Sequence, residues 1–329
     1  MYTCKSFILN LFLLLLILAL AGCGGGSGGG NSSSISYTGS TSQAVITQTN
    51  GEDIAYNAYQ NGGAGNSLGG ILSIQPDPSK QLSRPRMLVL TRALKNSISQ
   101  ISFEQESQNN ILGATVTETE ILTGDCGGSA IYTISVNDVT YDFSGTFTFN
   151  ALCNEGVTLL GSLMFSGQFN PNTLAFGQLM MSYDNLTVRT GSNSFTADGD
   201  ITLDPSATPV NVTMNMVMQD NSTGKTYHAD NFVMTLTDNF ISVTMAITGR
   251  LYDPDYGYVD ITTPAPLVIN NGDSYPSSGV LLATGSNGSS GGPAKVILTA
   301  LSDTSYQIEI DEDGDGTFEY LDTGNWAGL

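Results

Sequence analysis

Apolar and polar side chains alternate through most of the chain beyond residue 115, most regularly at 141–149 and 212–218. Alternation with a period of two is typical of strands that bury one face and leave the other in water, and such strands pair in antiparallel fashion. Turn-forming segments at 170–172, 220–224 and 238–239 separate these runs at hairpin spacing. The pattern therefore predicts a mainly all-β fold, built as a large extended antiparallel β-sheet or meander.

Before residue 111 the apolar spacing changes to three and four residues, which indicates helices. Asn50 can cap a first helix that carries Glu52 and Asp53 in its opening turn and ends at Gly62-Gly63. A second helix is expected from about Arg86, because an apolar stripe follows at helical spacing. The members of this stripe are Met87, Leu90, Leu94, Ile98 and Ile101. We expect these two N-terminal helices to pack on or beside the sheet.

A loose repeat runs through the β part of the chain. Its members are Leu152, Leu186 and Phe232, which each follow a small or polar residue, and Gly161, Gly199 and Gly249, which each come shortly before the last apolar residue of a strand. The offsets between them are unequal, so a strict solenoid is not indicated. The spacing favours a duplicated hairpin unit inside a long meander.

The N-terminus has the layout of a secretory signal. Lys5 precedes a run from Phe7 to Leu20 that is apolar except for Asn10, and a charged start followed by roughly 7–15 apolar residues is typical of such signals. A permanent transmembrane helix needs about 20 apolar residues, so this run is too short to form one. We expect export, with residues 1–22 as a signal peptide.

The apolar run closes with Leu20-Ala21-Gly22-Cys23, which resembles the lipobox of bacterial lipoproteins. The resemblance implies that fatty acids such as palmitate are attached to Cys23 and that the signal is cut before this residue. Several acyl chains anchor a protein stably, where a single chain binds a membrane only marginally. The alternative is an ordinary signal peptide in which Cys23 is incidental.

The residues after Cys23 set the expected domain boundaries. Gly, Ser and Asn occupy 24–34 and form a flexible tether. We assign 23–43 to the lipidated cysteine and flexible linker, 44–110 to the helical segment and 111–329 to the antiparallel β domain. Gly24, and not Asp, follows the cysteine; by resemblance to enterobacterial sorting rules this implies a lipid anchor in the outer membrane, on either its periplasmic or its surface-exposed face.

Composition excludes one class of partner. The chain carries 30 acidic and 10 basic residues, a formal net charge of −20, whereas binding to nucleic-acid phosphates needs clustered Lys and Arg. Charged residues make up only 12% of the chain and aromatic residues 9%, which is not the composition of a disordered protein. We expect a folded domain that binds no nucleic acid.

Cysteine usage agrees with export. Cys4 leaves with the signal and Cys23 carries lipid, so Cys126 and Cys153 remain as an even pair in an oxidising compartment. We expect a structural disulfide between these two residues, closing a loop of about 27 residues. A redox-active pair is the alternative, although the C-x-x-C spacing of such pairs is missing here.

Several short motifs follow one another in a distinctive order. They are Cys126-Gly127-Gly128 after a helical segment, Phe149-Asn150-Ala151-Leu152-Cys153, Gly161 after an apolar strand, Pro276-Ser277-Ser278-Gly279, Gly285, a D-x-D-G-D-G run and Trp326. This order resembles a pattern found among uncharacterised outer-membrane lipoproteins of proteobacteria, and the resemblance covers most of 45–329. It implies an extended antiparallel sheet with helical packing, and it brings no known activity.

Catalysis finds little support in the residue inventory. His228 is the single histidine, and a Ser-His-Asp or Cys-His arrangement would depend on it. No G-x-S-x-G elbow is present to supply a serine, and zinc sites need several His or Cys ligands. Paired carboxylates that cleave glycosides stay formally open in so acidic a chain. We expect that the protein is not an enzyme and that His228 is a surface or hydrogen-bonded strand residue.

The strongest chemical motif is the acidic run at 311–322. Counted from Asp311, acidic residues occupy positions 1, 3, 5, 9 and 12, and Gly316 occupies position 6, which is the spacing of a calcium-binding loop. The candidate metal ligands are Asp311, Asp313, Asp315, Thr317 through its carbonyl, Glu319 and Asp322. Strand-like flanks argue against a helix-loop-helix. The alternative is a plain hairpin turn built from residues that tolerate positive φ, and Ca²⁺ is the one cofactor that the sequence suggests.

Met214, Met216 and Met218 share one face of an expected strand. Their M-x-M-x-M spacing resembles copper-handling segments of periplasmic proteins, because soft thioethers select Cu(I). Further methionines fall on neighbouring strands, which favours core packing with adaptable side chains: Met180, Met181, Met234 and Met245. An apolar-ligand surface and a copper site are the alternatives.

Two classes of function follow from these features. The first is a membrane-anchored bacterial lipoprotein with a non-catalytic binding or scaffolding role towards an envelope partner, stiffened by calcium at its last hairpin. The second is a carrier of a lipid or another apolar ligand in an open groove of the β-sheet. An open concavity lined by Met and Phe would favour the carrier, and a sealed core would favour the first class.

Overall fold

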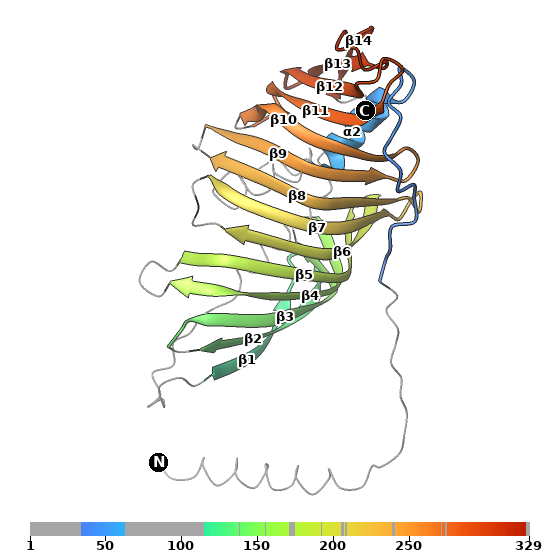
Figure 1. Cartoon of the computed structure of the whole chain (residues 1–329). Helices are drawn as coiled ribbons and strands as arrows, with labels where there is room; N and C mark the ends of the chain where they lie inside the picture. The colour runs from blue at the N-terminus through green and yellow to red at the C-terminus, as the bar shows by residue number, and fades with distance from the viewer. Residues whose placement is uncertain are drawn as a thin grey trace, which may run out of the picture. The chain divides into compact units, whose positions relative to one another are not determined.

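The computed structural model describes residues 34–62, 115–137, 139–154, 156–170, 175–191, 193–204, 207, 209–238, 241–270, 272–273 and 275–326 (Figure 1). These residues belong to one unit of the chain, Ser34–Leu329. The expected signal peptide, Cys23, most of the tether and the second expected helix lie outside the described residues.

A single antiparallel sheet accounts for most of the described residues. Its 14 strands pair in sequence order, each with the next one along the chain, so the expected all-β meander is confirmed. The strands are β1 (Thr115–Thr123), β2 (Gly127–Asn137), β3 (Asp142–Asn154), β4 (Val157–Asn170), β5 (Ala175–Thr190), β6 (Asn193–Asp204), β7 (Val210–Asp220), β8 (Thr226–Asp238), β9 (Ser242–Asp253), β10 (Gly257–Asn270), β11 (Ser278–Asn287), β12 (Pro293–Ser302), β13 (Ser305–Asp311) and β14 (Tyr320–Asn325).

Side chains alternate between the two faces of the sheet, and one face packs the core. In β7 the side chains of Val212, Met214, Met216 and Met218 are buried, while those between them are more exposed. The same alternation recurs in β9, β12 and β13. Burial of one continuous apolar face is the dominant favourable term for such a sheet, and it explains the period-two pattern of the sequence.

The loose repeat of the sequence marks a line of β-bulges across the sheet, which we call the crease. Ala151 on β3, Asn185 on β5 and Asn231 on β8 adopt positive φ angles of 52°, 51° and 49°, and the pairing register shifts at each of them. An extra residue in one strand bends that strand and increases its twist. The residues that follow these bulges point into the core and are buried: Leu152, Leu186 and Phe232.

Glycines provide the space that the crease requires. Gly161 and Gly249 have φ angles of 119° and 148°. A Cβ atom added to Gly161 would lie 2.7 Å from the carbonyl oxygen of Asn185, and one added to Gly249 would lie 2.7 Å from the Cα atom of Phe232. Only a residue without a side chain fits both the backbone conformation and the close approach of the next strand.

One helix, α2 (Gly51–Gly62), is present among the described residues, at the position of the first expected helix. It packs against β8, β9 and β11–β13 through a buried face of Ile54, Ala55, Ala58 and Tyr59. The side-chain oxygen of Asn50 accepts a hydrogen bond from the N–H of Thr47 (2.8 Å), so it fixes the turn before the helix. No helix in the described part of the chain is long and apolar enough to cross a membrane.

Residues 34–50, which we call the strap, run along the ends of the strands (Figure 1). The hydroxyl of Tyr37 donates to the carbonyl of Asp253 (2.8 Å), and the N–H of Ala44 donates to the carbonyl of Tyr258 (2.8 Å). The strap therefore lies on the sheet from its beginning to α2. Its first ten residues belong to the stretch that the sequence assigns to a flexible linker, so the ordered unit begins earlier than residue 44.

Candidate functional site

Cys126 and Cys153 form the expected disulfide, and their Cα atoms lie 5.1 Å apart. The bridge joins the residue before β2 to the end of β3, where the N–H of Cys126 also donates to the carbonyl of Cys153 (3.2 Å). A covalent link between neighbouring strands stabilises a fold mainly by restricting the unfolded chain. The candidate lipidation site, Cys23, lies outside the described residues.

The acidic run folds into a loop between β13 and β14, which we call the acidic loop (311–319). Its own backbone holds its carboxylates in place. The N–H groups of Gly314 and Gly316 donate to the two oxygens of Asp311 (2.8 and 3.1 Å), and the N–H of Asp315 donates to Asp313 (3.0 Å). Gly314 and Gly316 have φ angles of 78° and 92°, a region that favours glycine.

Four carboxylates of the acidic loop converge. One oxygen each from Asp311, Asp313, Asp315 and Glu319 lies within 4.8 Å of the other three. Asp311 is completely buried, and the remaining three are partly or largely exposed. Hard oxygen donors at this spacing are the ligands that Ca²⁺ prefers, although Ca²⁺ needs six to eight oxygens in total. The arrangement can hold a divalent cation on its solvent side.

The two other candidate ligands lie differently. The N–H of Thr317 donates to Asp315 (2.6 Å), which keeps its backbone in the loop beside the carboxylate cluster. Asp322 sits on β14 opposite Ile308, where its carboxylate accepts from the hydroxyl of Tyr320 (3.0 Å) and from the N–H of Thr323 (2.7 Å). Asp322 is therefore not brought into the cluster, because β14 resumes sheet pairing at Tyr320 and carries it away from the loop.

Neighbouring segments brace the acidic loop. Ser290, in the turn between β11 and β12, donates its N–H to the carbonyl of Asp313 (2.8 Å) and its hydroxyl to the carboxylate of the same residue (2.9 Å). Glu312 accepts a hydrogen bond from the N–H of Gln48 in the strap (2.9 Å). The loop is thus held from two sides by segments far from it in the sequence.

His228 lies on the face of β8 opposite the core, in a row of aromatic rings. Its ring stacks on that of Tyr252 at a centroid distance of 5.2 Å and lies 6.2 Å from that of Tyr37. Burial among these rings lowers the pKa of His228, with a smaller opposing effect from Asp230. The imidazole stacks on Tyr252 and lies close to Tyr37, so it helps to pack the strap against β8.

The methionine stripe of β7 faces the core. Met214, Met216 and Met218 are buried, as core packing requires. The neighbouring methionines divide between the faces. Met181, Met234 and Met245 are buried beside the stripe, whereas Met180 points to the opposite face and is 49% exposed.

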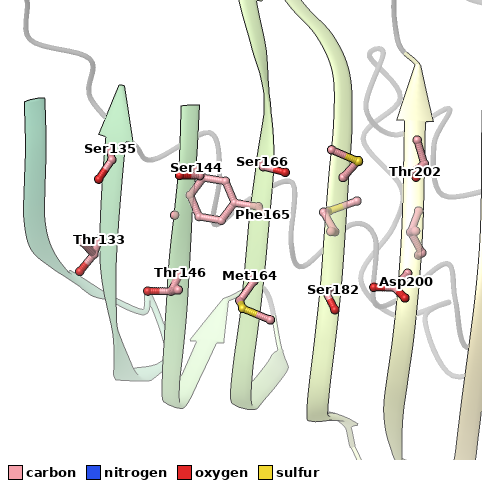
Figure 2. Close-up of a pocket in the computed structure, with 14 residues that line it drawn as sticks. Thr133, Ser135, Ser144, Thr146, Met164, Phe165, Ser166, Ser182, Asp200 and Thr202 are labelled. Atoms are coloured by element: carbon pink, nitrogen blue, oxygen red, sulfur yellow. The ribbon is translucent and has the colours of Figure 1, made fainter. Parts of the chain in front are cut away.

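A shallow groove of about 560 Å³ lies on the face of the sheet opposite the core, over β2 to β6. Two rows of its side chains run straight across these five strands (Figure 2). Pairing register sets each residue of a row directly beside the next. The first row is Thr133, Thr146, Met164, Ser182 and Asp200. The second row is Ser135, Ser144, Ser166, Met180 and Thr202.

Short polar side chains make up half of the residues that line the groove, although most of its exposed surface is apolar. Serine and threonine supply seven hydroxyl groups, and no Lys, Arg or His is among the described residues that line it. Met164 and Met180 provide exposed thioethers near the middle. Asp200 closes the β6 end, next to Asp198, whose pKa is raised by burial and then by the charge of Asp184. The groove is therefore rich in hydroxyls and negatively charged at one end.

The groove is the feature that reading the sequence alone misses. Alternation identifies which residues of a strand are buried, and it treats the residues between them as a solvated face. A signal is nevertheless present, because small hydroxyl residues fill the outward positions of five successive strands. The short side chains of neighbouring strands leave a hollow, and this hollow becomes visible only when the register of all five strands is known.

Comparison with protein families, with curated proteins and with solved structures finds no match for this chain. What the protein does has to be inferred from its own residues and their arrangement.

Proposed function

We propose that this chain is a lipid-anchored lipoprotein of the bacterial outer membrane with a non-catalytic binding or scaffolding role in the cell envelope. One observation carries the proposal: a 14-stranded sheet packs its core on one face and presents short polar side chains in a groove on the other. A broad hydroxyl-rich face of this kind offers contacts for a partner without supplying a reactive group. The lipobox-like Leu20-Ala21-Gly22-Cys23 supports the anchor.

The strap supports this role by its position between the anchor and the sheet. Ten residues, 24–33, separate Cys23 from the first strap residue, and a Gly-rich chain of this length has an end-to-end distance of about 17 Å. Tyr37 and Ala44 are hydrogen-bonded to β9 and β10. Lipid on Cys23 would therefore keep the sheet close to the bilayer.

A calcium ion in the acidic loop is part of the proposal. Asp311, Asp313, Asp315 and Glu319 would supply carboxylate oxygens, and the carbonyl of Thr317 and water would complete the coordination. The chemistry of this donor set fits Ca²⁺, because all the donors are hard oxygens. A bound ion would act structurally, by offsetting the repulsion among the clustered carboxylates.

The position of His228 supports a non-catalytic role. Its half-buried ring stacks on Tyr252 and lies near Tyr37, so the imidazole takes part in packing the strap, and it is the only histidine of the chain. The alternative role, a carrier of apolar ligands, would need an open apolar groove. Met214, Met216 and Met218 are sealed in the core. The groove over β2–β6 exposes Met164 and Met180 and would be the place for an apolar ligand. We place the carrier second because seven of the residues that line this groove are serine or threonine.

Membrane fractionation of a Cys23→Ala variant tests the anchor. Without the acyl chains, this variant should move from the membrane fraction to the soluble envelope fraction, because nothing else in the proposal holds the domain to lipid. Cys4→Ala is the matched control and should stay with the membrane, since Cys4 lies inside the expected signal. Should Cys23→Ala remain with membranes after a high-salt wash, lipid on Cys23 is not the tether.

A further inference from the structure

We propose that the groove over β2–β6 binds an extended, uncharged glycan that lies across the strands, with its sugar units along the two side-chain rows. The inference deepens the binding role proposed above and rests on it. Two rows of five side chains, set side by side by strand register, form the proposed site (Figure 2).

The distance between neighbouring strands is the first property of the groove that matches a glycan. Neighbouring strands lie about 4.8 Å apart, so five strands offer five evenly spaced positions over roughly 19 Å. This period is close to the length of one pyranose unit in an extended glycan. A glycan laid across the strands would meet an equivalent pair of side chains at each sugar, from Thr133 and Ser135 on β2 to Asp200 and Thr202 on β6.

The chemistry of the lining points to the same ligand. A hydroxyl group both donates and accepts hydrogen bonds, which matches the hydroxyls of a sugar in either direction. Ser144 and Thr146 project such groups from β3, and Ser182 projects one from β5. At the centre, Met164 and Met180 are 56% and 49% exposed. Their thioethers are soft and adaptable, and they suit the C–H face of a sugar ring.

The charge of the lining residues restricts the class of ligand further. The described residues of the lining include no cationic side chain, and Asp200 contributes a carboxylate close to Asp198, which also interacts with Asp184. A phosphate- or carboxylate-bearing glycan would meet repulsion at this end. Nine of the ten residues in the two rows are uncharged, so hydrogen bonding, and not ion pairing, is the main means of recognition. The expected ligand is therefore neutral.

Calorimetric titration of the full chain, in a detergent without a sugar headgroup, tests the proposal. The probes are neutral hexasaccharides of glucose, mannose, galactose and N-acetylglucosamine, with hexamers of glucosamine and of galacturonic acid as cationic and anionic comparisons. At least one neutral hexasaccharide should bind. Its disaccharide should bind at least tenfold more weakly, because two sugars reach only two of the five strands.

Matched variants locate the binding. Thr146→Trp places a large ring in the middle of the groove and should weaken binding at least tenfold. Thr248→Trp makes the same change at an exposed position of β9, outside the groove, and should leave binding within twofold.

Three outcomes overturn the proposal: no neutral hexasaccharide binds, a charged hexamer binds more tightly than every neutral one, or the two Trp variants weaken binding equally. In the second of these outcomes, tighter binding of the glucosamine hexamer would assign the groove to cations. None of these results touches the membrane anchor, which fractionation of Cys23→Ala tests separately.

Discussion

The backbone N–H of Gln48 donates a hydrogen bond of 2.9 Å to Oε2 of Glu312, across 264 residues of sequence. Gln48 belongs to the strap and Glu312 to the acidic loop. Glu312 also donates its own N–H to Oε2 of Glu319 (3.0 Å), a member of the carboxylate cluster. A cation among the carboxylates would therefore stiffen the residues that hold the strap.

Calcium should raise the thermal stability of the protein. We expect a Kd of about 10⁻⁴–10⁻³ M, the range of extracellular calcium modules. At ten times Kd the ion would stabilise the fold by RT ln 11, or about 1.4 kcal/mol, which corresponds to a rise in Tm of about 2–4 °C for a domain of this size. Thermal unfolding with calcium and with a chelator measures the difference.

The double variant Asp313→Asn with Asp315→Asn provides the control for the calcium effect. Asn also suits turns, so the loop should keep its fold while losing two of its four clustered charges. The calcium-dependent rise in Tm should disappear in this variant. An absent shift in the parent protein at 10 mM calcium would show that the loop is a plain turn.

Replacing Glu312 should loosen the strap. Glu312→Ala removes the acceptor for the N–H of Gln48, and one hydrogen bond to a charged group contributes about 1.5–3 kcal/mol. Amide hydrogen exchange should accelerate at 43–50 and stay unchanged in β3 and β4. Glu309→Ala, two strand positions before the loop, is the matched control. Equal exchange in both variants would mean that the contact does not hold the strap.

Reduction should destabilise the oxidised protein. Cys126 and Cys153 are 27 residues apart, and a loop of that length corresponds to about 3 kcal/mol in the chain-entropy account. The oxidised protein should resist thiol alkylation until it is reduced, and its mass should be about 2 Da below that of the dithiol, since one disulfide replaces two S–H groups. Free alkylation of both cysteines without reduction would contradict the bridge.

Adding a side chain to a glycine of the crease should lower the free energy of unfolding. Gly249→Ala places a Cβ 2.7 Å from Phe232 Cα at a φ of 148°, and strained backbone of this kind costs about 1–3 kcal/mol. Gly177→Ala in β5 meets only ordinary contacts, the nearest at 3.4 Å from Gln168, and should be nearly neutral. Denaturant unfolding of the two variants gives the comparison, and similar midpoints would argue against a strained crease.

Features that depend on neighbouring residues in the sequence could be predicted from it. Alternation fixed the strands and the buried side of Met214 and Met216, because the period of a strand is local. The acidic loop was predictable for the same reason: Asp311 to Glu319 lie within nine residues, and their spacing determines how their oxygens converge. The pairing of Cys126 with Cys153 followed from the number of cysteines and from the export that the N-terminal sequence predicts.

Features that depend on register could not be predicted. Gly161 and Gly249 stand out in the sequence as members of a repeat. That they lie against the bulges at Asn185 and Asn231 can be known only once the pairing of adjacent strands is known. Asp322 has the right spacing for a metal ligand and is nevertheless drawn onto β14 by pairing with Ile308. The spacing of residues in the sequence does not show where a strand resumes its hydrogen bonding with the neighbouring strand.

The position of the strap also determines the order in which the contacts of the fold can form. Neighbouring strands can pair as soon as both have been made, because every pairing joins consecutive strands, and such local contacts form early. The strap is made before all of them, yet its partners include Tyr258 and Glu312. Contacts across so long a loop form late. A chain cut short before its last hairpin would keep the contacts of the strap with Asp253 and Tyr258 and lose the contact of Gln48 with Glu312, so the part of the strap next to α2 would be the last to dock.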